Sequence, residues 1–151
     1  MIDKKTFKTA ISTRFKDAAF IKKGQSWYLN GRDAIIVVNL QKSNWDDSYY
    51  LNIGIWLKVL GDAIYPQYNH CHLYFRAEAL FPEQQDLIRM SCDLEMATLE
   101  ILVELTKFIE NMLIPFLREC TDGNGLKKFT KQGLLEKGLV RIEARRYLTG
   151  E

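Results

Sequence analysis

Apolar residues near the start of the chain recur at the spacing of a helix. Phe7, Ile11 and Phe15 are four positions apart, and lysines and arginines occupy the other sides of the segment. Asp3 comes just before it and can cap the first turn, because a carboxylate accepts hydrogen bonds from free backbone N–H groups. We predict an amphipathic helix over residues 4–20.

The next part of the chain alternates between apolar and polar positions. Residues 26–29 and 34–42 are rich in β-branched and aromatic side chains. They flank Asn30-Gly31, a dipeptide that favours the positive φ angles of a type I′ hairpin turn. Residues 48–58 and 70–76 alternate again. These four segments predict an antiparallel meander of strands.

The pattern returns to a helical period after Pro82. An apolar stripe predicts a long helix that kinks or ends near Pro115, because proline removes a backbone donor. Residues 84–92 are compatible with a fifth strand or with a helical turn, and residues 126–132 and 134–148 are short helical candidates. The stripe consists of Leu94, Ala97, Ile101, Leu105, Phe108 and Met112.

Together these elements predict an α+β fold. We expect an antiparallel four- to five-stranded meander sheet, with an N-terminal helix and C-terminal helices packed on one face. The sequence shows no linker or repeat, and 47% of its residues are hydrophobic, as in an ordinary globular domain. We therefore expect residues 1–151 to form a single α+β domain, and we exclude a disordered, collagenous or coiled-coil chain.

Side-chain parity divides the predicted strands into two faces. The face expected beneath the helices is apolar and consists of Trp27, Leu29, Ile36, Val38, Leu40, Leu51, Ile53, Ile55, Leu57, Leu73 and Phe75. The opposite face offers aromatic rings for stacking and fixed hydrogen-bond donors and acceptors, so it is a candidate ligand-binding surface. Its candidate residues are Asn39, Gln41, Asn52, Trp56, His72, Tyr74 and Arg76. A solvated sheet face is the alternative interpretation.

Charge is unevenly distributed, although the net charge is only +2. Residues 78–119 carry nine acidic and three basic side chains and lie between two basic flanks. The glutamates of the predicted long helix form a candidate partner-binding set: Glu95, Glu100, Glu104 and Glu110. The basic side chains near the C-terminus are interrupted by Glu136 and Glu143, so this composition does not favour a nucleic-acid partner.

The sequence contains no complete catalytic motif. Glycine-rich phosphate loops, nucleophile elbows and H-E-x-x-H helices are all absent. His70 and His72 point the same way on a predicted strand, as two zinc ligands do, but the sequence identifies no third ligand. On that strand Cys71 points into the apolar layer, where a thiol behaves as a small hydrophobe. We therefore expect no catalytic residue, no cofactor and no metal.

Cysteine usage and hydropathy bear on the compartment. The chain has three cysteines, an odd number at wide spacing, which does not fit a disulfide framework. No stretch approaches the ~20 apolar residues that span a bilayer, and the first residues lack the apolar region of a signal peptide. We expect a cytoplasmic protein without a membrane partner.

A lysine-rich turn and two strand motifs occur in the first part of the chain. The turn lies in residues 20–28, an N-x-Q-K-S strand end lies in residues 37–43, and an N-x-G strand lies in residues 49–55. With Asn39, Gln41, Asn52 and Gly54 at the matching positions, these motifs resemble the bacterial family of domain of unknown function 4304. The family has no established activity, so the resemblance supports the fold. Small bacterial α+β domains of this kind look like the neutralising partners of secreted toxins.

These observations lead to two functional hypotheses. The first is a non-catalytic protein-binding module, an immunity protein that neutralises a bacterial toxin domain by direct binding through its acidic helix. Its partner is then a cognate toxin or another protein. The alternative is a small-molecule-binding protein or enzyme that uses the polar and aromatic face of the sheet.

Overall fold

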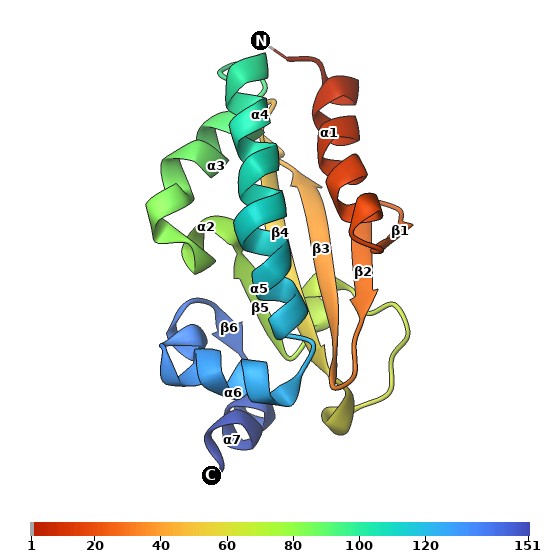
Figure 1. The fold of residues 1–151 in the computed structure, drawn as a ribbon, viewed down its shortest axis with the longest axis vertical. Coiled ribbons are helices and arrows are strands. Elements are labelled where there is room, and N and C mark those ends of the chain that lie inside the picture. The colour runs from red at the N-terminus through yellow and green to blue at the C-terminus, as the bar shows by residue number, and fades with distance from the viewer. Residues whose placement is uncertain (1) are drawn as a thin grey trace.

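A six-stranded antiparallel sheet forms the centre of the fold, and each strand pairs with the next along the chain (Figure 1). The computed structural model describes residues 2–151. The predicted meander is confirmed, but it has six strands rather than four or five, because β1 and β6 are too short to show alternation in the sequence. The strands are β1 (Ile21–Lys23), β2 (Ser26–Asn30), β3 (Ala34–Lys42), β4 (Tyr49–Leu57), β5 (Leu73–Arg76) and β6 (Leu139–Val140).

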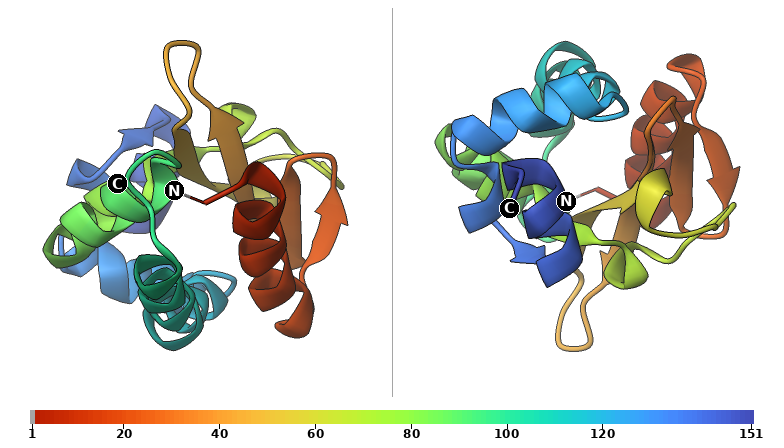
Figure 2. Two further views of the ribbon diagram at one scale, coloured as in Figure 1. Left: turned by 90° about the horizontal axis from the view of Figure 1, so that it is seen from above. Right: turned by 90° about the horizontal axis from the view of Figure 1, so that it is seen from below.

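Helices cover one face of the sheet, as predicted, and two views place α1 and α4 on the same side of it (Figures 1 and 2). The α-helices are α1 (Lys4–Asp17), α2 (Ala77–Leu80), α3 (Gln85–Cys92), α4 (Leu99–Phe108), α5 (Ile114–Glu119), α6 (Gly123–Lys131) and α7 (Ile142–Thr149). The other helical segments are η1 (Lys58–Leu60), η2 (Tyr68–His70), η3 (Pro82–Gln84), the π-helical η4 (Ile109–Leu113) and η5 (Leu134–Glu136).

The predicted N-terminal helix is confirmed in α1. The Asp3 carboxylate accepts a hydrogen bond from the backbone N–H of Thr6 at 2.8 Å and caps the first turn. The apolar side chains at four-residue spacing are fully buried, and Phe15 stacks on Trp27 of β2 with ring centroids 5.4 Å apart. This aromatic contact fixes α1 against the sheet.

The predicted apolar sheet face is also confirmed. Ten of its eleven residues are buried in the main core, and Leu29 packs against that core while partly exposed. The long paired strands β3 and β4 determine this result, because nine consecutive pairs from Ala34–Leu57 to Lys42–Tyr49 fix the register and hence the parity of every side chain.

The long helix runs through Pro115 rather than ending there. Residues 99–119 form α4, η4 and α5 in direct succession, and the π-helical segment ends two residues before the proline. A wider helical turn at this position accommodates a residue that cannot donate a backbone hydrogen bond.

The apolar stripe of this helix is predicted one residue too early at its C-terminal end. Met112 is exposed and Leu113 is buried, because neighbouring apolar residues made either register compatible with the pattern.

Two segments differ from their predicted form, and a third resolves an open alternative. The β2–β3 loop comprises residues 31–33 and is closed by a 3.0 Å hydrogen bond from Gly31 N–H to Ala34 O, and no residue in it has a positive φ, so it is not a type I′ turn. Residues 84–92, left open between strand and helix, contain α3. The helix predicted over residues 134–148 is divided into η5, β6 and α7.

The β4–β5 connection covers much of the sheet face that was predicted to be either a ligand-binding surface or solvated. In Figure 1 residues 61–72 cross behind the sheet from the lower end of β4. They contribute to a second apolar cluster, which consists of Tyr28, Ile35, Val37 and Cys71 with Trp56 and Tyr68 packed against it. The second face is therefore only partly open. Within residues 2–151, none of the helices combines the length and the hydropathy of a membrane-spanning segment.

Candidate functional site

The predicted sheet-face residues fall into two groups that share Asn52: those that hold the β4–β5 connection and those that line a hollow. An amide network is the first part of the group that holds the connection. Asn39 and Asn52 face each other across β3 and β4. The side-chain amide of Asn52 donates to Asn39 Oδ1 at 3.2 Å and to Gln41 Oε1 at 3.0 Å. The Tyr68 hydroxyl donates to the same Gln41 oxygen at 3.2 Å. This network ties the β4–β5 connection to the sheet, so Asn39 and Gln41 have a structural role here.

His72 and Trp56 also hold the β4–β5 connection. His72 Nδ1 accepts a hydrogen bond from the backbone N–H of Leu57 at 2.9 Å, and its ring centroid lies 4.4 Å from that of Trp56. Trp56 Nε1 donates to Gly61 O at 2.9 Å. Burial lowers the pKa of His72, with a smaller contribution from the charge of Arg141. The imidazole is thus a neutral acceptor built into the fold.

The second group lines a hollow at the β5 edge of the sheet, which we call the sheet-face hollow. It has a volume of about 320 Å³ and is bounded by β4, β5, the β4–β5 connection and the segment that precedes β6. Its lining residues are Asn52, Tyr68, Tyr74, Phe75, Arg76, Ala79, Lys137, Gly138 and Leu139. Asn52, Tyr74 and Arg76 are predicted candidates, whereas Tyr68 lies in η2 and Lys137 follows η5, and neither is predicted to lie on this face.

The sheet-face hollow is closed on one side by a tight backbone approach. A Cβ atom on Gly138 would lie 2.4 Å from Tyr74 O, so only glycine lets the chain pass this close to β5. Leu139 then pairs with Tyr74 in the sheet. The structure therefore places Lys137 directly beside the end of β5, which sequence separation alone does not indicate.

The predicted acidic helix is less uniform than its sequence indicates. Glu95 precedes α4, and Glu110 lies in η4, where it forms a 3.1 Å ion pair with Arg14 of α1. Glu104 forms a 3.3 Å ion pair with Lys107 one turn later on α4. Glu110 therefore stabilises the packing of two helices, and Glu95, Glu100 and Glu104 remain on the exposed end.

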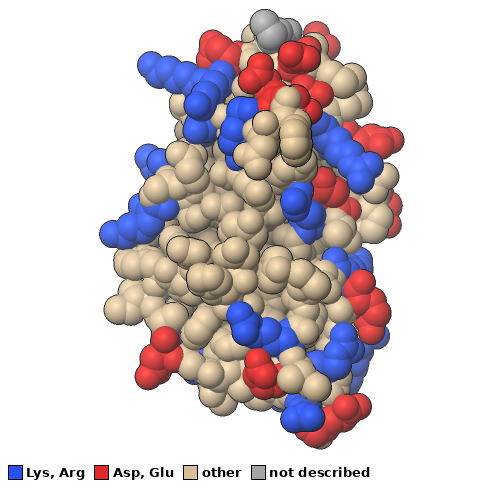
Figure 3. Space-filling view, turned by 180° about the vertical axis from the view of Figure 1, so that it is seen from behind, with Lys and Arg blue, Asp and Glu red and all other residues tan. Residues whose placement is uncertain are grey.

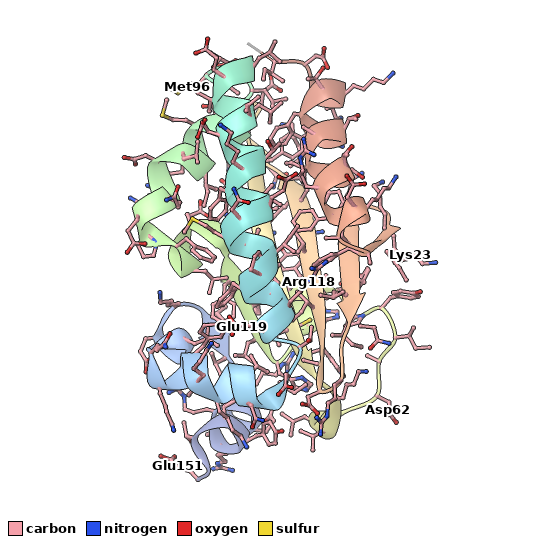
Figure 4. All side chains as sticks on the ribbon, viewed as in Figure 1. Lys23, Asp62, Met96, Arg118, Glu119 and Glu151 are labelled. Atoms are coloured by element: carbon pink, nitrogen blue, oxygen red, sulfur yellow. The ribbon has the colours of Figure 1, made fainter. Side chains whose placement is uncertain are left out.

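Three apolar side chains lie beside these glutamates, and sequence reasoning did not single them out. Met96, Leu99 and Val103 have exposed fractions of 56%, 66% and 50%. Leu99 and Val103 are four positions apart and therefore lie on one side of α4, and Met96 lies in the turn that precedes the helix. We call them the α4 apolar strip, and Figure 4 shows Met96 at the end of the molecule where α4 begins. The sequence does contain a signal for this surface, because Leu99 and Val103 are apolar but lie outside the apolar stripe predicted to face the core.

The structure places the two histidines and the cysteine considered as metal ligands or nucleophile in different surroundings. His70 ends η2 on the surface while His72 is buried, so they are not adjacent ligands on one strand, and among residues 2–151 no group of three His, Cys, Asp or Glu side chains converges. Cys71 lies in the second apolar cluster rather than in the main core, because the chain before Leu73 is not in a strand. Burial raises the pKa of Cys71 to about 12.

The remaining cysteines and the basic tail offer no compact reactive group. Burial raises the pKa of Cys92 to about 12, and it also raises that of Cys120. Basic residues of the C-terminal segment are distributed over α6, α7 and the turns between them, and Lys128 is paired with Glu119 at 2.5 Å. Viewed from behind, uncharged side chains cover most of the middle of the molecule (Figure 3).

Comparison with known proteins adds a family assignment. The comparisons with curated proteins and with solved structures found no match. Residues 11–119 match a family described as a domain of unknown function, DUF4304. The matched region extends from α1 through α5 and includes β1 to β5, whereas α6, β6 and α7 follow it. The chain thus belongs to the DUF4304 family.

Proposed function

We propose that this protein is a non-catalytic, cytoplasmic protein-binding module that neutralises a toxin domain by binding to it directly. The observation that carries the proposal is the α4 apolar strip with its acidic rim. Met96, Leu99 and Val103 are each at least half exposed, and Glu95, Glu100 and Glu104 are their sequence neighbours. Protein interfaces combine an apolar centre with a polar rim in this way.

The proposed partner has a basic surface. Large apolar side chains are more stable when a partner covers them than when they face water. The favourable free energy is about 25 cal/mol for each Å² of apolar surface that is removed from water. The adjacent carboxylates would attract a cationic partner and accelerate association. A toxin that acts on nucleic acid needs cationic side chains to bind phosphates, so such a domain has the complementary charge.

The α4 end is preorganised for binding. The Thr98 side chain accepts a hydrogen bond from the backbone N–H of Ile101 at 3.2 Å and caps α4. The helix also contacts α1 and α3 along its buried side. A surface that is already ordered loses little conformational entropy on binding, which favours affinity.

Co-expression with the polypeptide encoded next to this chain in its source genome tests the proposal. We expect one-to-one binding by titration calorimetry and suppression of that polypeptide's toxicity. The triple variant Glu95→Lys, Glu100→Lys, Glu104→Lys should weaken binding about tenfold or more, mainly through the association rate. The control Glu83→Lys, Glu143→Lys, Glu151→Lys makes the same change in net charge at other exposed positions.

A second pair of variants tests the apolar component. Leu99→Ser with Val103→Ser should weaken binding while the protein stays folded, because both side chains are already in water. Equal affinity of the charge-reversed protein, its control and the serine variant would place the interface elsewhere. Absence of both binding and toxicity for the neighbouring polypeptide would overturn the immunity function.

A further inference from the structure

We propose that the sheet-face hollow binds a small aromatic oxyanion, a carboxylate or phosphate monoester attached to an aromatic ring. The proposal concerns a different surface from the α4 apolar strip and does not depend on the toxin-neutralising function. It rests on a fixed arginine, a second cation, two tyrosine walls and a buried amide around one cavity.

Arg76 is held in place by a ring rather than by a carboxylate. Its guanidinium carbon lies 3.8 Å from the centroid of the Tyr50 ring, which is close enough for cation–π stacking. Among residues 2–151 its guanidinium has neither a hydrogen-bond acceptor nor an ion-pair partner. Stacking orients the plane of the group and leaves its N–H edge free, and this edge matches the two oxygens of a carboxylate or phosphate.

A second cation borders the sheet-face hollow from the opposite segment. Lys137 lines the same cavity, and its ammonium group donates to Leu80 O at 3.3 Å. None of the nine residues that line the hollow is acidic. The two positive charges are therefore not neutralised by the lining itself, and an anion in the cavity interacts favourably with both.

The rest of the lining suits a flat apolar body. Tyr68 and Tyr74 meet edge to face with centroids 6.1 Å apart, and Leu139 lies beside Tyr74 across the β5–β6 pair. Aromatic walls favour a ring as the body of the ligand. The volume of about 320 Å³ is near the lower end of the range of small-molecule pockets, so the ligand is small.

Asn52 provides a polar group at the base of the sheet-face hollow. The residue is only 2% exposed, and its Nδ2 group is occupied by Asn39 and Gln41. Its Oδ1 atom has no hydrogen-bond donor among the described residues. A hydroxyl or amine on the ligand ring can donate to this oxygen, which would distinguish substituted rings from plain ones.

Titration of the full chain with four probes tests the ligand class. Phenyl phosphate and benzoate should bind saturably, with Kd values of about 1 mM or tighter. Inorganic phosphate should bind more weakly because it lacks the ring, and benzyl alcohol should bind more weakly because it lacks the charge. Backbone amide NMR shifts should change at Tyr74, Arg76 and Leu139. Equal binding of benzyl alcohol and phenyl phosphate, or no binding of any anion, would overturn the proposal.

Substitutions then test the assignment of each group. Arg76→Gln should weaken phenyl phosphate binding about tenfold or more, since it removes charge-assisted hydrogen bonds. Arg76→Lys should restore only part of the affinity, because an ammonium group lacks the planar fork. Arg32→Gln is the matched control, since that side chain is 83% exposed on the β2–β3 loop. If thermal melts show that Arg76→Gln is folded and its affinity is unchanged, the site is not in the sheet-face hollow.

Discussion

The carboxylate of Asp33 accepts a hydrogen bond from the backbone N–H of Gly123 at 2.8 Å, across ninety residues of sequence. Asp33 lies in the β2–β3 loop, and Gly123 is the first residue of α6. The backbone N–H of Asp33 also donates to Thr121 O at 2.8 Å. A sheet loop and a helix start are thereby joined, which positions the C-terminal segment that contributes Lys137 to the sheet-face hollow.

The first prediction concerns this junction. Asp33→Ala should lower the free energy of unfolding by about 1–2 kcal/mol, because it leaves a backbone donor in the first turn of α6 without its acceptor. Asp33→Asn keeps an oxygen in place and should lose less. Urea denaturation of the two variants measures the difference. Equal stability of wild type and Asp33→Ala would show that solvent replaces the bond without loss.

The close approach of the same loop leads to a second prediction. A Cβ atom on Gly31 would lie 2.0 Å from Thr121 Cβ, so Gly31→Ala requires the loop or the α5–α6 connection to move. We expect a destabilisation of about 1–3 kcal/mol, as is usual for overpacking. Gly31→Ala combined with Thr121→Gly should recover part of the loss in urea denaturation. Failure to recover any of it would locate the problem in the backbone of Gly31 instead.

The sequence predicted the faces of the sheet well where strands are long and paired throughout. β3 and β4 share nine residue pairs, so parity counted from the sequence placed Ile53 in the core and Asn52 on the other face. Parity failed at Cys71, because the residues before Leu73 belong to an irregular connection with no two-residue period. β1 and β6 were missed for a related reason, since two or three residues are too few for a pattern.

The candidate sites were predictable only in part. Asn52, Tyr74 and Arg76 were identified because each lies on a strand, where alternation along the sequence shows to which face of the sheet a side chain points. Lys137 was not, since its place beside β5 depends on the tight passage of Gly138 against Tyr74. In the same way, Glu110 was assigned to a binding surface although it pairs with Arg14, a contact set by how α1 and η4 pack together. Such contacts arise from tertiary packing, which local sequence patterns do not encode.

The third prediction concerns pH. Burial, with a smaller contribution from the charge of Arg141, lowers the pKa of His72 in the folded state, while the unfolded chain keeps a value near 6.5. The unfolded state therefore binds more protons below that value, and stability falls as pH decreases from about 6.5 until the folded-state pKa is reached. Urea denaturation between pH 7.5 and about 5 should show this decline.

Each of the two histidines can be replaced to test this assignment. His72→Asn places an amide oxygen at the same side of the backbone and should flatten the pH dependence between about pH 5 and 6.5, whatever its effect on stability at neutral pH. His70→Asn is the control, because His70 is exposed at the end of η2. A pH dependence that persists in His72→Asn would assign the decline to carboxylates elsewhere in the chain.

The fourth prediction concerns thiol reactivity. Cys71, Cys92 and Cys120 are all buried, and burial raises the pKa of each thiol because the apolar surroundings disfavour the thiolate. The thiolate is the reacting form, so a disulfide-exchange reagent at about pH 8 should leave all three unmodified in the folded protein. In urea all three should react quickly.

Slow modification of the native protein would follow local opening, and Cys71 should then react first. It lies under the β4–β5 connection, whereas Cys92 and Cys120 lie in the main core. If Cys92 or Cys120 reacts before Cys71 in peptide mapping of partly labelled protein, the β4–β5 connection is more firmly packed than the main core.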